Sequence, residues 1–115
     1  MNYLLNVSNH NLTKEQIEEM KKRGYEIVEM QEKDKLAWGQ LNPSNYKEIA
    51  DRILKNYGVE AYHVAGFAPA VAYFVSKADF CFYAYSERKS IEKEVNGVIT
   101  KTSIFEHKGF FMYEK

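Results

Sequence analysis

The hydrophobic positions at the start of the chain form a short continuous run and then change to a helical spacing. Residues 3–7 are mostly apolar and predict a central strand. Thr13 and Gln16 have the spacing of a capping box, which predicts the start of a helix. Gly24 ends this predicted helix, and residues 25–30 predict a second strand.

The middle of the chain contains one region without a clear period and one helical stripe. Residues 31–43 are mixed and charged, include Trp38, and predict a loop with one helical turn. The sequence Asn42-Pro43-Ser44 then signals a helix start. Apolar residues follow at helical spacing and predict a helix that Gly58 closes; they are Tyr46, Ile49, Ala50, Ile53, Leu54 and Tyr57.

Residues 61–71 predict a strand that turns directly into a helix. The strand ends at Gly66, which can adopt a backbone conformation that larger residues resist. Pro69 lies near the first helical position, and the helix extends to about Lys77. This helix is apolar on more than one face, so we expect it to be deeply buried, including against a second subunit.

The final third of the chain predicts strands and a hairpin. Residues 80–85 form a continuous apolar run, typical of a strand that is covered on both faces. Asn96-Gly97 predicts a two-residue type I′ turn, with Val95 opposite Val98 and Glu92 opposite Lys101. Residues 110–113 predict one more strand.

Strands thus alternate with helices before a hairpin ends the chain. This order predicts an α/β fold: a small, Rossmann-like, mostly parallel sheet flanked by helices, with a C-terminal antiparallel β-hairpin. The 115 residues, 45% of them hydrophobic, fit a single domain over residues 1–115.

Charge and cysteine content narrow the choice of partners and compartment. The 16 basic and 16 acidic residues cancel, which argues against a protein that binds long duplex nucleic acid. No apolar run approaches the roughly 20 residues of a membrane helix. No signal peptide is visible, and the single cysteine, Cys81, is expected to be an inert core thiol. We therefore expect a cytoplasmic protein without a membrane partner.

Three segments follow predicted strands and contain the residues that suit a phosphate ester. In a parallel sheet, ligands bind beyond the carboxyl ends of the strands. Backbone amides and hydroxyls come from the first two segments, and a guanidinium and an ammonium come from the third. The three predicted turns are Ser8-Asn9-His10, Gly66-Phe67-Ala68 and Ser86-Glu87-Arg88-Lys89.

Each of these segments also has a purely structural interpretation. Ser8 and Asn9 suit a turn or a helix cap, and His10 suits a solvated loop. Gly66 suits close packing, and Arg88 suits a surface ion pair with Glu87 or Glu92.

Other chemistries find little support in the sequence. The three histidines, His10, His63 and His107, lack metal-ligand spacing, so no metal is expected. Neither a phosphate-loop signature nor a dinucleotide fingerprint is present, and no cofactor is expected. Ser8 is not surrounded by a nucleophile-elbow pattern.

Four segments, in order, resemble the motifs of small stand-alone CRISPR-associated ring nucleases from type III systems. The first is Ser8-Asn9-His10-Asn11-Leu12-Thr13-Lys14-Glu15-Gln16, and the second is Tyr62-His63-Val64-Ala65-Gly66. The third is Tyr85-Ser86-Glu87-Arg88, and the last comprises Asn96-Gly97, Phe105-Glu106-His107 and residues 110–113. Trp38 also falls where some members have tryptophan.

The resemblance implies a CARF-like homodimer that binds cyclic oligoadenylate, most often the tetra-adenylate, across the dimer cleft. Catalytic members need no metal and align a ribose 2′-hydroxyl on its neighbouring phosphate, which leaves a 2′,3′-cyclic phosphate. Transferred by position, Ser8, Asn9 and His10 would contact ribose or phosphate, and the turn Gly66-Phe67-Ala68 would approach phosphate or base. Ser86, Arg88 and Lys89 would meet the scissile phosphate, and Glu87 would be a further ligand-binding residue of this segment. Arg88, Ser86 and His10 would be the catalytic residues.

The sequence departs from the family pattern at two places. Phe67 stands where members commonly have a polar or acidic residue, and Gly109, Phe111 and Met112 stand where arginines are common. Three hypotheses follow: a metal-independent ring nuclease that ends type III CRISPR signalling, a non-catalytic sensor or sponge of the same fold, and an interaction protein that binds no nucleotide.

Overall fold

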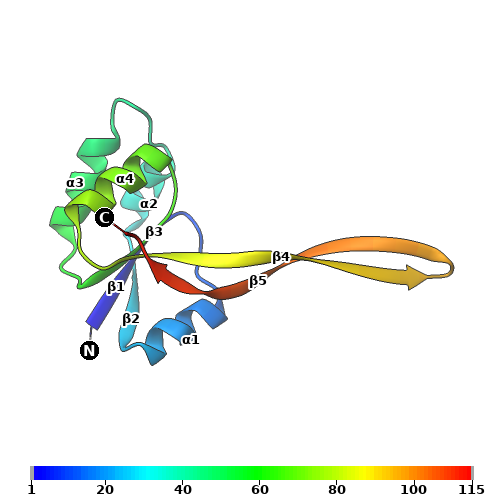
Figure 1. The fold of residues 1–115 in the computed structure, drawn as a ribbon. Coiled ribbons are helices and arrows are strands. Elements are labelled where there is room, and N and C mark those ends of the chain that lie inside the picture. The colour runs from blue at the N-terminus through cyan, green and yellow to red at the C-terminus, as the bar shows by residue number, and fades with distance from the viewer. Residues whose placement is uncertain (1, 115) are drawn as a thin grey trace.

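Five strands form one mixed sheet in the order β2-β1-β3-β4-β5 (Figure 1). The computed structural model describes residues 2–114. The strands are β1 (Asn2–Val7), β2 (Tyr25–Glu29), β3 (Ala61–Val64), β4 (Cys81–Val95) and β5 (Val98–Met112). The first four are parallel where they pair, and β5 is antiparallel to β4. The predicted α/β class, mostly parallel sheet and C-terminal hairpin are therefore confirmed.

Helices cover both faces of the sheet (Figure 1). One face packs against α1 (Lys14–Lys22), and the other against α2 (Glu32–Trp38), α3 (Tyr46–Asn56) and α4 (Ala68–Lys77). Because side chains alternate along a strand, β1 contributes to two cores. Leu5 joins the larger cluster with Phe74, and Leu4 joins the smaller one with Met20 and Phe110.

Local signals in the sequence set several of these boundaries. The Thr13 hydroxyl accepts from the backbone N–H of Gln16 at 3.2 Å, and the Gln16 side chain accepts from the Thr13 N–H at 2.8 Å, which completes the capping box. Asn96 and Gly97 have φ values of 53° and 79°, as a type I′ turn requires. The predicted pairing of Glu92 with Lys101 is also present, with a Nζ–Oε1 distance of 3.6 Å.

The prediction of a loop with one helical turn over residues 31–43 is wrong, because this segment contains α2. Tertiary contacts stabilise this short, charged helix. Asp34 is buried, and its carboxylate accepts from the Arg52 guanidinium at 3.1 Å and from the Tyr57 hydroxyl at 2.7 Å. Trp38, at the end of α2, is buried in the larger core. Neither contact is visible as a helical period in the sequence.

Two predictions about the last third of the chain are also wrong. Residues 86–89 do not form a turn but lie within β4, because the cross-strand ladder continues without interruption to the Asn96-Gly97 turn. Residues 110–113 do not form a separate strand, since residues 110–112 are the end of β5. Nor is the apolar run over residues 80–85 covered on both faces, because Tyr83 and Tyr85 are 36% and 45% exposed.

The β4–β5 hairpin extends far beyond the body of the molecule (Figure 1). With the hairpin included, the molecule measures 58 × 36 × 28 Å along its principal axes. Its base is fastened to α1. The Glu19 carboxylate contacts His107 Nε2 at 2.8 Å and accepts from the backbone N–H of Phe110 at 2.9 Å. Arg23 donates to the Phe110 carbonyl at 3.0 Å. The rest of the hairpin has no helix against it in the described chain.

Candidate functional site

The carboxyl ends of β1 and β3 lie side by side at the point where the chain changes direction across the sheet. After β1 the chain passes to α1 on one face, and after β3 it passes to α4 on the other. In open α/β sheets this switch point forms a crevice in which ligands bind. The predicted turns Ser8-Asn9-His10 and Gly66-Phe67-Ala68 both lie here.

Asn6 connects the first turn to strands β2 and β3 through buried and part-buried hydrogen bonds. Its side-chain nitrogen donates to the His10 carbonyl at 2.9 Å and to the Glu29 carboxylate at 3.0 Å. Its side-chain oxygen accepts from the Ser8 hydroxyl at 2.7 Å and lies 2.9 Å from His63 Nδ1. Since both partners of the nitrogen are acceptors, the orientation of the amide is fixed. His63 Nδ1 must therefore donate, which leaves the lone pair on Nε2.

His63 remains neutral at physiological pH. Two effects together lower its pKa from 6.5 to about 4: burial, because the imidazolium loses its hydration, and the nearby His10. The side chain is 5% exposed. A neutral imidazole with a fixed tautomer offers Nε2 as a hydrogen-bond acceptor to a hydroxyl group.

Helix α2 fastens both turns of the site. Trp38 Nε1 donates to the Ala65 carbonyl at 2.8 Å. The Asn9 side-chain amide donates to the Lys35 carbonyl at 2.8 Å and accepts from the Gly39 N–H at 3.2 Å. Helix α2, which the sequence analysis did not predict, thus holds in place the two turns that the sequence analysis identified as candidate ligand contacts.

Gly66 occupies a place where no other residue fits without strain. Its φ is +146°, and a Cβ atom there would lie 2.9 Å from Trp38 Nε1. The close approach of the Trp38 ring therefore requires glycine at this turn.

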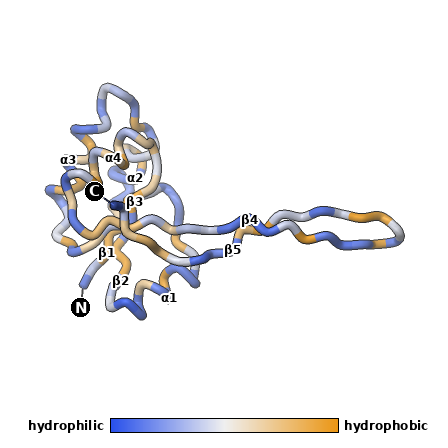
Figure 2. Tube along the Cα trace, in the orientation of Figure 1, coloured by the Kyte–Doolittle hydropathy of each residue, from blue (hydrophilic) through white to orange (hydrophobic). Residues whose placement is uncertain are grey.

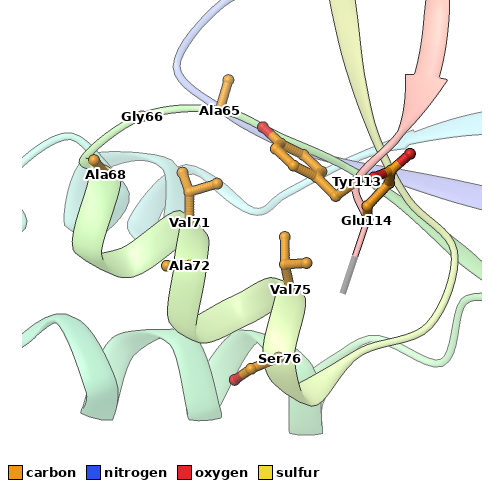
Figure 3. A pocket seen from close by; sticks show the side chains of 9 residues that line it. All are labelled: Ala65, Gly66, Ala68, Val71, Ala72, Val75, Ser76, Tyr113 and Glu114. Carbon is orange, nitrogen blue, oxygen red and sulfur yellow. The ribbon is translucent and has the colours of Figure 1, made fainter.

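An apolar groove of about 720 Å³ begins at this glycine and runs along α4 (Figure 3). Val71, Ala72 and Val75 line one side, and Tyr113 lies opposite. The Tyr113 hydroxyl donates to the Val64 carbonyl at 2.7 Å, which anchors the chain beyond β5 to the end of β3. Gly66 and Ala68, two of the predicted ligand contacts, line the groove. Its size and apolar walls suit a flat heterocycle.

The structure brings two of the three predicted segments together and leaves the third apart. Ser8 is buried and hydrogen-bonded within the Asn6 network, whereas His10 is exposed. Phe67 packs against Tyr46, with 6.1 Å between ring centroids. Phe82 of β4 pairs with His63 of β3. Ser86 lies four residues further along β4, which places it about 13 Å beyond His63.

Other members of the third segment make surface contacts on the hairpin. The Glu87 carboxylate lies 4.0 Å from Lys108 Nζ, and Arg88 and Lys89 pair with Phe105 and Ile104 across the strands. All four residues of this segment are exposed.

Sequence reasoning missed Asn6 as a site residue and considered His63 only as a metal ligand. A signal was nevertheless present, since each is a polar residue inside an apolar strand, and the two pair directly across β1 and β3. Only the strand order shows that they meet. Among residues 2–114, no three His, Cys, Asp or Glu side chains form a group able to hold a metal ion.

Comparison with known protein families gives one match. The model of the family described as "Uncharacterized protein MJ1673 family" matches residues 2–111. The chain belongs to this family. The match includes both switch-point turns and all but the last residue of the β4–β5 hairpin. No curated protein and no solved structure matches the chain. Within residues 2–114, every helix is too short or too polar to cross a membrane.

Proposed function

We propose that this chain is a cytoplasmic, metal-independent ring nuclease that binds and cleaves cyclic oligoadenylate, with the tetra-adenylate ring as its substrate, and so ends type III CRISPR signalling. The observation that supports this most is the pair of turns at the switch point, joined by Asn6 to a neutral His63. The strand order β2-β1-β3-β4 supports the associated proposal that the fold is Rossmann-like and CARF-like. The ordered sequence motifs support the choice of ligand.

The proposed reaction needs neither a metal nor water. The ribose 2′-oxygen attacks the adjacent phosphorus, and the bond from phosphorus to the 5′-oxygen breaks. The proton of the 2′-hydroxyl passes, by way of a phosphate oxygen, to the departing 5′-oxygen, so the step neither takes up nor releases a net proton. The products are a 2′,3′-cyclic phosphate and a 5′-hydroxyl, and catalysis consists mainly of alignment and charge stabilisation.

The described residues suggest a role for each part of the site. His63 Nε2 accepts a hydrogen bond from the 2′-hydroxyl and so fixes its direction. The Ala68 N–H at the start of α4, next to Gly66, faces the phosphate, as N–H groups at helix N-termini do; Pro69 has no N–H, and that of Ala70 donates to the Phe67 carbonyl. His10 is exposed on the first turn and close enough to His63 to influence its pKa, and from there it can approach the phosphate oxygens. The apolar groove along α4 accepts an adenine base.

A sensor or sponge that binds the ring without cleaving it is the second candidate. Two observations favour it: Phe67 adds no charge to the rim, and Arg88 lies on the hairpin, beyond the rim of its own subunit. In either case a homodimer would present the same rim twice to a symmetric ring.

Thermal melting with cyclic tetra-adenylate tests the binding step shared by both candidates. A ligand at a hundredfold its dissociation constant stabilises the folded state by about 2.7 kcal/mol. We expect a clear rise in Tm with the ring and none with linear adenosine monophosphate at equal concentration. An unchanged Tm with both cyclic tetra- and hexa-adenylate would refute both nucleotide functions.

The variant Arg88→Ala tests whether the hairpin contributes to ligand contact. If Arg88 meets a phosphate, affinity or turnover falls more than tenfold, whereas a solvated surface residue gives almost no change. Lys101→Ala, on the same hairpin nearer the tip, is the matched control.

A further inference from the structure

One face of the β4–β5 hairpin carries exposed apolar side chains from its base to its tip, with charged residues and threonines between them. Odd-numbered residues of β4 and their partners on β5 point to this face, since side chains alternate along a strand. We call it the hairpin stripe, and its large apolar members are between 36% and 64% exposed. They are Tyr83, Tyr85, Ile91 and Val95 from β4, and Val98, Ile104 and Phe111 from β5.

The opposite face of the hairpin differs in character. At the base, Phe82 and Phe110 are buried under α1. Further out this face is mostly polar and includes the ion pair between Glu92 and Lys101. Its large apolar residues beyond the base are Ile99 and Phe105, with Met112 at the very end of β5. The two faces of the hairpin therefore differ: beyond the base the stripe carries four large apolar residues, and the opposite face carries two, Ile99 and Phe105.

An uncovered stripe of this length is unusual for a single chain. A two-stranded ribbon is at best marginally stable in water, and it needs further packing to be persistent. The apolar run over residues 80–85 is typical of a strand covered on both faces, yet Tyr83 and Tyr85 are exposed in one copy. Figure 2 shows apolar segments on both strands near the tip, far from the body. Something must cover this face.

The charged residues of the hairpin indicate which kind of partner covers the hairpin stripe. Residues 86–107 contain four basic and four acidic residues, so the hairpin has no net charge to attract nucleic acid or an anionic membrane. On the stripe itself the charges are ordered along the hairpin. Glu87 and Glu106 lie towards the base, Lys89 lies between them and Ile91, and Lys93 lies towards the tip. This order is self-complementary for two hairpins that run in opposite directions.

We propose that the hairpin stripe is the surface on which two copies of this chain dimerise, with their hairpins antiparallel about a two-fold axis midway between Lys89 and Ile91. This axis places Val95 and Val98 of one copy on Tyr85 of the other, Lys93 opposite Glu87, and the aliphatic part of Lys89 on Ile91. The rings of Tyr83 and Tyr113 lie 5.0 Å apart, so the stripe continues into the α4 groove and enlarges the available interface. Such a contact is isologous, as a symmetric dimer requires. It deepens the proposed function, because a ring bound by two subunits needs a dimer, but it is argued from the hairpin alone.

Sedimentation equilibrium of the full chain without nucleotide tests the proposal. The matched variants are Val98→Glu, on the stripe, and Ile99→Glu, on the opposite face; both native side chains are 64% exposed. We expect a wild-type dimer, a dissociation constant raised at least tenfold by Val98→Glu, and no comparable change with Ile99→Glu. Circular dichroism confirms that each variant is folded.

A charge exchange tests the register of the two hairpins. Lys93→Glu places like charges opposite Glu87 and should weaken the dimer, and the double variant Lys93→Glu with Glu87→Lys should restore it. The proposal is overturned if the wild type is a monomer at every accessible concentration, if Val98→Glu leaves the dimer intact, or if the Val98 and Ile99 variants dissociate equally. An antiparallel register is wrong if the double variant is no tighter than Lys93→Glu. Ring binding is measured separately, so its failure would leave the dimer proposal standing.

Discussion

The buried His63 predicts a specific dependence of stability on pH. Its pKa is about 4 in the folded chain and 6.5 when it is solvated. Between these two values the unfolded chain binds more protons than the folded chain, so stability falls as the pH decreases. At about 1.36 kcal/mol for each unit of pKa, the loss is about 3 kcal/mol between pH 6.5 and pH 4. For a domain of this size that corresponds to a decrease in Tm of about 10 °C.

The variant His63→Asn isolates this contribution. The Asn side-chain nitrogen occupies the place of Nδ1 and keeps the donor to Asn6, but it does not titrate. We expect its free energy of unfolding, measured by urea denaturation across this pH range, to vary less than that of the wild type by about 3 kcal/mol. The control Val64→Ala, next to His63 on the opposite face of β3, should lower the wild-type curve without changing its shape.

The titration of the Glu19 carboxyl group does not disturb the comparison between the wild type and His63→Asn. Burial raises the pKa of Glu19, but hydrogen bonds from the Phe110 N–H and from His107 outweigh it and lower the pKa below 4.5. Its contribution is present above pH 4.5 and is lost below it, equally in wild type and variant. Parallel curves for the wild type and His63→Asn would refute the account of a buried, neutral His63.

Two further predictions concern the structure around the site and the hairpin. Gly66→Ala should lower the free energy of unfolding by about 1–3 kcal/mol, because the new Cβ atom would meet Trp38. Gly58→Ala should lower it far less, because the space around Gly58 is open. Chemical denaturation of both variants measures the difference. Glu19→Gln should cost about 1–2 kcal/mol and increase amide hydrogen exchange in the last part of β5, and unchanged exchange there would show that α1 does not fasten the hairpin.

The fold was predictable where local chemistry decides it. The capping box at Thr13, the Asn96-Gly97 turn and the apolar runs of β1 and β3 each specify their element by short-range interactions. Helix α2 was not predictable, because it depends on contacts between Asp34 and residues of α3 and beyond. A charged stretch such as residues 86–89 resembles a turn until its partner strand is known.

The candidate site, like the fold, could be predicted from the sequence only in part. Its two turns follow from strand ends and glycine, which are visible in the sequence. The Asn6–His63 pair depends on β1 and β3 being neighbours, although the two residues are 57 positions apart in the chain, and no local pattern specifies this. The hydrogen-bond network of the candidate site therefore emerges only from the topology of the sheet.

The most direct test of the proposed function is incubation of the wild-type protein with radiolabelled cyclic tetra-adenylate in EDTA, with the products resolved by gel electrophoresis and mass spectrometry. A parallel reaction with His10→Ala tests the exposed histidine of the first turn. We predict a linear oligoadenylate that ends in a 2′,3′-cyclic phosphate, formed more slowly by the variant. An intact ring that shifts in a binding gel would contradict the nuclease and identify a sensor or sponge. An intact ring that does not bind at all would contradict both nucleotide functions.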